Sequence, residues 1–354
     1  MSGRQLAVSA SLLGLALNAT STAMADSTPL YRVTQTVTLG APDRWDYVVF
    51  DPPSKRVYVA HGDEVTVVDG DKGAILGHVK GLAGGTHGIA VVPGAKRGYT
   101  DDGEAGIAAS FDLTTFAVQS RIKAAEDADA VAFDPVSGHV FVINGDGGTI
   151  TVIDPKTNAG IGTIQGGGKL EYAVPDGKGK LYVNGAGKQE VLAIDTATNQ
   201  VSGRFPVTSC TSPHGLAVDP QTRRLFVSCL NKLLMVVDAD TGKVVAQIPI
   251  GAGSDAVAFD PKRKLIFSSN GVDGTLSIIR EENAHTFTPV GDMKTALTAR
   301  TMGIDPMTGR LYLAAADVAT DAAASTPPAP PAQGRRRPKL VPGSLKLLFL
   351  DPTG

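Results

Sequence analysis

The sequence predicts an all-β fold of seven similar antiparallel sheets, and three observations support this. Related segments begin at residues 46, 87, 129, 171, 214, 255 and 300, so the chain repeats every 41 to 45 residues. Each repeat contains short runs of β-branched and aromatic residues, separated by Asp-Pro, Asn-Gly or Asp-x-x-Thr-Gly turns. The 41 Gly and 22 Pro among 354 residues leave little room for long helices. Four strands in each of seven repeats are typical of a seven-bladed β-propeller.

The four strands follow one another in the same order within the repeats. The first strand contains the repeated segment, as in DYVVFDP and DAVAFDP. The second follows a short turn, as in RVYVAHG and KLYVNGA, and the third ends near Asp, as in VTVVD and ITVID. A fourth strand closes the repeat, as in AILGHV and KVVAQI.

The two ends of the chain predict how the ring closes. The seventh repeat reaches only its third strand, LKLLFLD, before the sequence ends, so its fourth strand is missing. The segment YRVTQTVTLG at 31–40 has the composition of a fourth strand. We expect it to complete blade seven and remove the open edges of the ring.

An export signal is predicted at residues 1–25. Arg4 precedes the apolar run from Leu6 to Leu17, and Ala23-Met24-Ala25 supplies the small residues of a cleavage site. Residues 26–354 would then form a single periplasmic domain. No later apolar run approaches the roughly 20 residues that span a bilayer, so no membrane span is expected.

Charge and composition limit the classes of partner. With Arg4 removed, 32 Lys and Arg stand against 35 Asp and Glu, a net charge of −3. This charge gives no general attraction to nucleic acid. The two cysteines, Cys210 and Cys229, reach the same face of the fifth repeat, and an oxidising compartment predicts a disulfide between them.

One insertion interrupts the seventh repeat. Residues 317–343 lie between its second and third strands and contain TPPAPPA and RRRPK. This Pro-rich composition does not pack a core. A solvated loop and a loop that binds a protein partner are both compatible with it.

The second and third strands also carry a family resemblance. The Tyr/Phe-Val-x-Asn pattern in YVNG and FVING, followed by VVD or VID, with a period near 42, resembles the YVTN repeats of exported bacterial propellers, the YncE-like group. The resemblance covers residues 30 to 354, although the literal YVTN tetrapeptide does not occur. It implies a seven-bladed periplasmic propeller and no particular chemistry.

A titratable residue occupies the same position in all seven repeats, five residues before the end of the first strand. Asp, Glu, His and Arg make up only about one residue in six, so chance does not explain a complete set. We call this set the ring residues: Asp46, His87, Asp129, Glu171, His214, Asp255 and Arg300.

The ring residues predict a binding site at one mouth of the propeller channel. Four carboxylates and one guanidinium sum to −3 with neutral histidines, and crowded like charges favour a compensating cation. His87 and His214 are predicted as ligands of a divalent metal ion or as bases, and the other ring residues as ligand-binding groups. In the alternative interpretation the ring residues only line a water-filled opening.

Trp45 stands beside Asp46 and is the only tryptophan. It is predicted either to stack on a ring-shaped ligand or to form a wedge between blades one and seven.

Three functions are compatible with this pattern. The first is a binding protein that holds a metal ion or small ligand at the acidic, His-containing mouth. The second is a metal-assisted hydrolase, lactonase or lyase that uses the same site. The third is a protein-interaction scaffold. Whether any reaction is catalysed stays open at this point.

Overall fold

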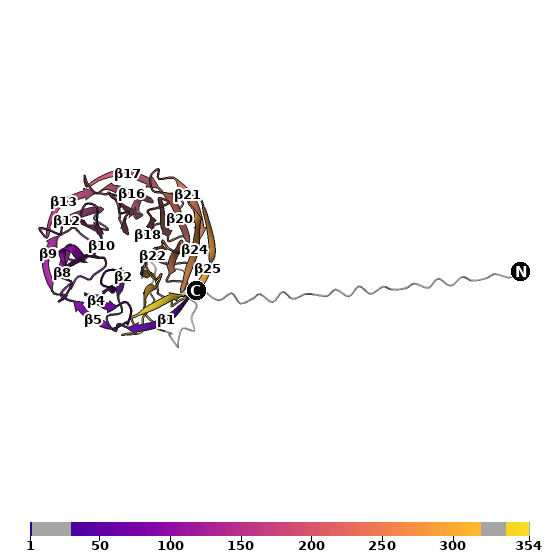
Figure 1. Ribbon diagram of the computed structural model, residues 1–354, viewed down its shortest axis with the longest axis horizontal. Coiled ribbons are helices and arrows are strands. Elements are labelled where there is room, and N and C mark those ends of the chain that lie inside the picture. Colours follow the sequence, from indigo (N-terminus) through magenta and orange to yellow (C-terminus); the bar gives the residue numbers. More distant parts are fainter. Residues whose placement is uncertain (2–29, 320–337, 354) are drawn as a thin grey trace.

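The structure is a computed structural model that describes residues 1, 30–319 and 338–353. Its strands form seven four-stranded antiparallel sheets, arranged as blades around a central axis (Figure 1). The predicted seven-bladed β-propeller is therefore confirmed. No helix in the described part of the chain is long and apolar enough to cross a membrane. The predicted signal peptide, apart from Met1, and the TPPAPPA and RRR segments lie outside the described residues.

The strands have the following bounds. Blade 1 consists of β2 (Trp45–Asp51), β3 (Arg56–His61), β4 (Glu64–Asp69) and β5 (Ile75–Val79). Blade 2 consists of β6 (Ile89–Val92), β7 (Arg97–Asp102), β8 (Ile107–Asp112) and β9 (Val118–Lys123). Blade 3 consists of β10 (Ala128–Asp134), β11 (His139–Asn144), β12 (Thr149–Asp154) and β13 (Ala159–Gln165). Blade 4 consists of β14 (Ala173–Pro175), β15 (Lys180–Gly185), β16 (Glu190–Asp195) and β17 (Gln200–Pro206).

The remaining blades follow the same order. Blade 5 consists of β18 (Pro213–Asp219), β19 (Arg224–Cys229), β20 (Leu233–Asp238) and β21 (Val244–Pro249). Blade 6 consists of β22 (Ser254–Asp260), β23 (Leu265–Asn270), β24 (Thr275–Asn283) and β25 (Thr286–Lys294). Blade 7 consists of β26 (Thr301–Ile304), β27 (Leu311–Ala315), β28 (Lys346–Pro352) and β1 (Tyr31–Thr38). Short 3₁₀ turns at Pro93–Ala95 and Ala186–Lys188 complete the described elements.

The N-terminal strand closes the ring as predicted. β1 pairs antiparallel with β28, from Tyr31 opposite Pro352 to Thr38 opposite Lys346. Figure 1 shows this junction, where the indigo start of the described ring lies beside its yellow end. Because β1 covers β28, the third strand of blade 7 does not expose its backbone groups at the ring junction.

Burial follows the place of each strand in its blade. The second and third strands lie inside a blade, and their side chains are buried on both faces, as in β11 and β20. This explains their continuous apolar composition. The outermost strands face solvent on one side, and β17 alternates exposed and half-buried residues along its whole length.

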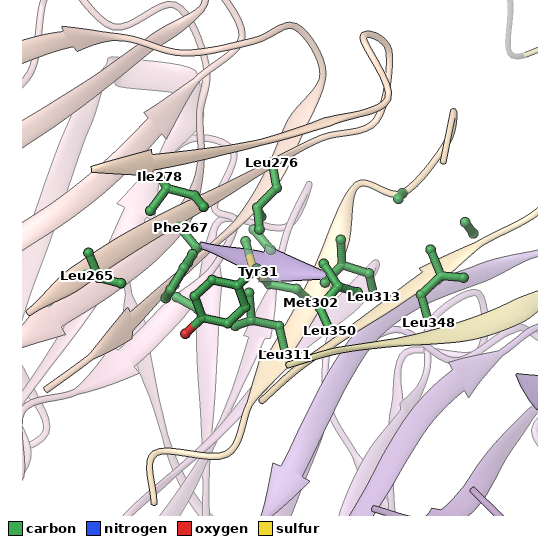
Figure 2. Close-up of a cluster of buried hydrophobic side chains, with 14 residues drawn as sticks. Tyr31, Leu265, Phe267, Leu276, Ile278, Met302, Leu311, Leu313, Leu348 and Leu350 are labelled. Atoms are coloured by element: carbon green, nitrogen blue, oxygen red, sulfur yellow. The ribbon is translucent and has the colours of Figure 1, made fainter. Parts of the chain in front are cut away.

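The hydrophobic core consists of seven clusters, one between each pair of neighbouring blades. Figure 2 shows the cluster between blades 6 and 7, in which Tyr31 lies among Leu265, Phe267 and Leu311. The Tyr31 ring is 5.1 Å from the Phe267 ring, and its hydroxyl donates to the Gly309 carbonyl at 3.1 Å. The closing strand thus also fills the interface between two blades.

The disulfide and the long insertion lie in blades 5 and 7. Cys210 and Cys229 are bonded, with their Cα atoms 5.2 Å apart, and the bond joins the approach to β18 with the end of β19. The insertion leaves the ring between β27 and β28, where Val318 and Leu340 form a short antiparallel bridge at its base.

Ring closure leads to a stability prediction. Tyr31→Ala should lower the free energy of unfolding by about 3 to 5 kcal/mol, because a buried aromatic ring is lost between two blades. Val33→Ala is the matched control in the same strand, since Val33 is 42% exposed, and should change stability by at most about 0.5 kcal/mol. Denaturant unfolding measures both. Equal losses of unfolding free energy in the two variants would contradict the role of Tyr31 in the interface between blades 6 and 7.

Candidate functional site

The inner strands begin with an irregularity that determines where the ring residues point. In β2, β10, β18 and β22 the pairing register shifts at the start of the strand, between Trp45 and Val48 in the first case. Asp46, Asp129, His214 and Asp255 lie inside these β-bulges. Bulges redirect side chains and break strict alternation. The remaining three ring residues lie one or two positions before their strands. All seven are partly exposed.

Six of the seven ring residues line one cavity of about 130 Å³, which we call the acidic cavity. They are Asp46, Asp129, Glu171, His214, Asp255 and Arg300. The other lining residues are Tyr47, Val48, Tyr172, Ala256, Thr301 and Met302. Blades 1, 3, 4, 5, 6 and 7 all contribute, so the cavity lies at the centre of the ring. Its size suits a small molecule or a few waters.

His87 does not line the cavity and instead pairs with a buried carboxylate. Its Nδ1 lies 2.8 Å from Oδ2 of Asp101. The other carboxylate oxygen of Asp101, Oδ1, accepts hydrogen bonds from the backbone N–H groups of His87 and Gly88 at 3.0 and 2.7 Å. Burial opposes the charged imidazole, but the bond to Asp101 and the nearby carboxylates outweigh it and raise the pKa of His87 to about 9. The raised pKa favours the imidazolium form of His87, whereas metal ligation requires the neutral imidazole.

Asp101 is a site residue that the sequence analysis missed. It lies near the end of β7 and is fully buried. Burial raises the pKa of Asp101 to about 6, against the lowering effect of His87. The signal in the sequence is an acidic residue in YTDD, at a place where the corresponding strands YVAH and FVIN have an apolar residue.

The surroundings of two carboxyl groups in the cavity raise their pKa values. Burial, reinforced by the charges of Asp46 and Glu171, raises the pKa of Asp129 well above its ordinary value. Burial also raises the pKa of Glu171, although His214 and Lys169 partly offset it. The Lys169 ammonium lies 3.6 Å from Glu171, but it is half exposed and is shared with Asp146. Both carboxylates would be stabilised by further positive charge.

Arg300 neutralises the opposite side of the cavity. Its Nε lies 2.7 Å from Oδ2 of Asp255, and its Nη2 donates to the Trp45 carbonyl at 2.7 Å. The guanidinium carbon is 5.0 Å from the centre of the Trp45 ring. Trp45 is 4% exposed and packs into the cluster between blades 7 and 1. Of the two predicted roles for Trp45, the buried wedge is the one that this position supports.

A pair of tyrosines crosses the ring, and the sequence analysis did not single it out. Tyr47 of blade 1 and Tyr172, just before β14 of blade 4, have ring centres 4.8 Å apart with planes inclined by 34°. These blades are not neighbours, so the contact spans the central axis. The signal is again a departure from the repeat, because the residue after the ring position is small in HGI, DAV and HGL but Tyr in DYV and EYA. In blade 2 the residue after the ring position is Gly88, where an added Cβ would lie 2.3 Å from the backbone nitrogen of Val131, which leaves no room for a side chain.

The polar turn residues on the same face serve the fold. The Asn144 amide donates to Thr149 and Thr151, and the Asn184 amide donates to the His214 carbonyl. Asn270 bonds Thr275 in the same way, and His61 is buried between Thr66 and Pro42. Among the described residues, no three His, Cys, Asp or Glu side chains are grouped so as to share a metal ion.

Comparison with known proteins supports the fold. No protein-family model matches the chain, and no curated protein matches it. A chain of the Kuenenia stuttgartiensis hydrazine synthase structure is similar with a TM-score of 0.67 and 16% identity, covering 78% of this chain and 93% of that one. A chain from the crystal structure of a mitotic checkpoint complex has a TM-score of 0.70 and 17% identity, covering 96% and 98%. At these identities the likeness shows the seven-bladed propeller fold alone.

The raised pKa of Asp129 leads to a pH-dependent stability prediction. A carboxyl that binds its proton more tightly in the folded state lowers stability as the pH rises above the ordinary carboxyl value of 3.8. Asp129→Asn removes this cost. We expect a gain of about 0.5 to 2 kcal/mol at pH 8 that disappears near pH 4.

Thermal unfolding at the two pH values measures this gain. The control is Asp146→Asn, which removes an equal charge from a side chain that is 63% exposed, and which should leave stability nearly unchanged. An Asp129→Asn variant that is less stable than the parent at pH 8 would contradict the assignment.

Proposed function

We propose that this chain is an exported propeller of the YVTN-repeat type that binds a small cation in the acidic cavity. The YVTN assignment rests on the repeat motifs, and the export on residues 1–25. Recovery of a periplasmic protein beginning at Asp26 is the expected result of intact-mass analysis. A secreted species that retains Arg4 would remove the export part of the proposal.

The crowding of carboxyl groups in the cavity is the observation that carries the binding proposal. Four carboxylates line it, and the Arg300 guanidinium is already bonded to one of them, Asp255. His87 is bonded to Asp101 and does not line the cavity, although its charge also acts on Asp46 and Asp129. Burial and the neighbouring carboxylates raise the pKa of Asp129 and of Glu171, so added positive charge in the cavity would stabilise the ionised form of both. A folded protein keeps such an arrangement at a cost in stability, which is common at functional sites.

Other functions use the same features differently. A divalent metal ion is the alternative cation, and His214 is the ring histidine that lines the cavity. Metal-assisted hydrolysis would require such an ion as well as a substrate. A protein-interaction scaffold would need neither, and it would use the open face of the ring and the base of the 317–343 insertion.

Direct binding measurements distinguish these possibilities. Calorimetry with chloride salts of Mg²⁺, Ca²⁺, Mn²⁺, Zn²⁺, ammonium and butylammonium should detect at least one that binds with one site per chain. Glu171→Gln should weaken that binding about tenfold or more, because it removes a charge from the cavity wall.

A control variant distinguishes the loss of a charge in the cavity wall from a change in the net charge of the protein. Asp146→Asn, on the same face but exposed, should change the affinity less than about threefold. Binding of none of the six cations would overturn the proposal, and so would equal losses in the two variants.

A further inference from the structure

We propose that a proton on the buried Glu281 carboxyl group holds blades 5 and 6 together, and that the junction between these blades loosens when the proton is lost. Three side chains carry this function, and we call them the proton relay: Glu281, Thr222 and Asp219. They do not line the acidic cavity, so the inference goes beyond the proposed cation site and does not depend on it.

The proton relay joins two neighbouring blades. Asp219 ends β18 of blade 5 and Thr222 lies in the turn that follows, whereas Glu281 lies in β24 of blade 6. Asp219 is fully buried, and Glu281 is only 3% exposed. Buried carboxylates destabilise a fold unless they are paired, so two carboxyl groups in one buried place require a positive group or a proton.

The number of hydrogen atoms shows that a proton is needed. Oγ1 of Thr222 lies 2.6 Å from Oε1 of Glu281 and 3.0 Å from Oδ2 of Asp219. A hydroxyl group has one hydrogen, so it donates to one of these oxygens, and an ionised carboxylate only accepts. Both contacts are hydrogen bonds only when one carboxyl group is protonated and donates to the hydroxyl oxygen. The relay is therefore complete with one bound proton.

The surroundings place this proton on Glu281. Asp219 accepts hydrogen bonds from the Lys264 ammonium group at 2.9 Å and from the Gln221 backbone N–H at 2.8 Å. Burial opposes the ionisation of Asp219, but these bonds outweigh it and lower the pKa of Asp219. Burial, with the adjacent Asp219, raises the pKa of Glu281 to about 7 against the opposing effects of Thr222 and Lys264. Glu281 thus donates to Thr222, and Thr222 donates to Asp219.

The charges around Glu281 do not replace the proton. The charged groups that act on it are Asp219 of β18 and Lys264, which precedes β23 and is already bonded to Asp219. In β25, the apolar residue Phe287 stands opposite Glu281. Other charged side chains of these strands and turns are paired with one another: Arg223 with Asp240, Arg224 with Asp238, Arg263 with Asp260, and Arg280 with Glu282.

The pH dependence of the junction follows from these contacts. The pKa of Glu281 is about 7 in the folded protein and 4.5 when the group is free. The proton therefore stabilises the junction fully below pH 4.5, and this contribution is lost as the pH rises from 4.5 to 7. Above this range Thr222 can donate to only one of two ionised carboxyl groups. The hairpin formed by β24 and β25 then separates more readily from the turn between β18 and β19.

Carbon-13 NMR of the side-chain carboxyl groups measures where the proton is lost. The signal that disappears in Glu281→Gln belongs to Glu281 and should titrate with a midpoint near pH 7. In Lys264→Met the midpoint should rise by about half a pH unit or more, because the ammonium group favours the ionised carboxyl. A Glu281 midpoint below pH 5.5 in the parent protein would overturn the proposal.

Hydrogen exchange tests whether the proton holds the blades together. Between pH 6 and pH 8 the backbone amides of residues 219–224 and 280–286 should lose about tenfold in protection, after correction for the intrinsic exchange rate. Glu281→Gln should remove this difference, because its amide N–H donates to Thr222 at both pH values. Glu282→Gln is the matched control, since that side chain is 43% exposed, and it should behave as the parent.

Two exchange results would contradict the proposal. One is a parent protein whose corrected protection in these segments is the same at pH 6 and pH 8. The other is a loss of protection in Glu281→Gln that equals the loss in Glu282→Gln, because the pH dependence would then not arise from the Glu281 proton.

Discussion

The closure of the ring by β1 is the constraint on which the rest of the structure depends. A stack of twisted sheets has two open ends, and pairing β1 with β28 joins them into one ring. The same strand places Tyr31 between blades 6 and 7. Only a closed ring brings the starts of seven inner strands to one place. The contact between Arg300 and the Trp45 carbonyl, 255 residues apart in the chain, shows how directly closure assembles the cavity wall.

The electrostatics of the cavity follow from this assembly. A symmetric ring would have the same side chain at all seven ring positions, but in this protein the ring residues differ in charge and in their partners. Arg300 offsets Asp255, and Asp101 takes His87 out of the cavity lining. The cavity carboxyl groups of blades 1, 3 and 4 lie next to two tyrosines. Structures at 16% and 17% identity share the propeller fold, so the fold alone does not predict how the ring residues of the seven blades differ.

The sequence predicted the features that the repeat determines. The seven-blade architecture, the closing strand and the set of ring residues all follow from a period near 42 and from strand patterns that recur in the blades. Side-chain direction at the ring positions did not follow, because a β-bulge breaks the alternation on which such reasoning depends. Asp101, Tyr47 and Tyr172 were missed for a related reason. They are departures from the repeat, and a pattern that the blades share does not predict them.

The number of protons released when a cation binds tests the central claim most directly. If burial and neighbouring carboxylates keep protons on the cavity carboxyls, an entering cation must displace protons, and Asp129 is the cavity carboxyl whose pKa is raised most clearly above its ordinary value. Calorimetry in buffers with different ionisation enthalpies, with whichever of the six cations binds most tightly, measures this number. We predict net proton release in the parent protein and less release in Asp129→Asn. Binding with no proton release, or with proton uptake, would contradict the account.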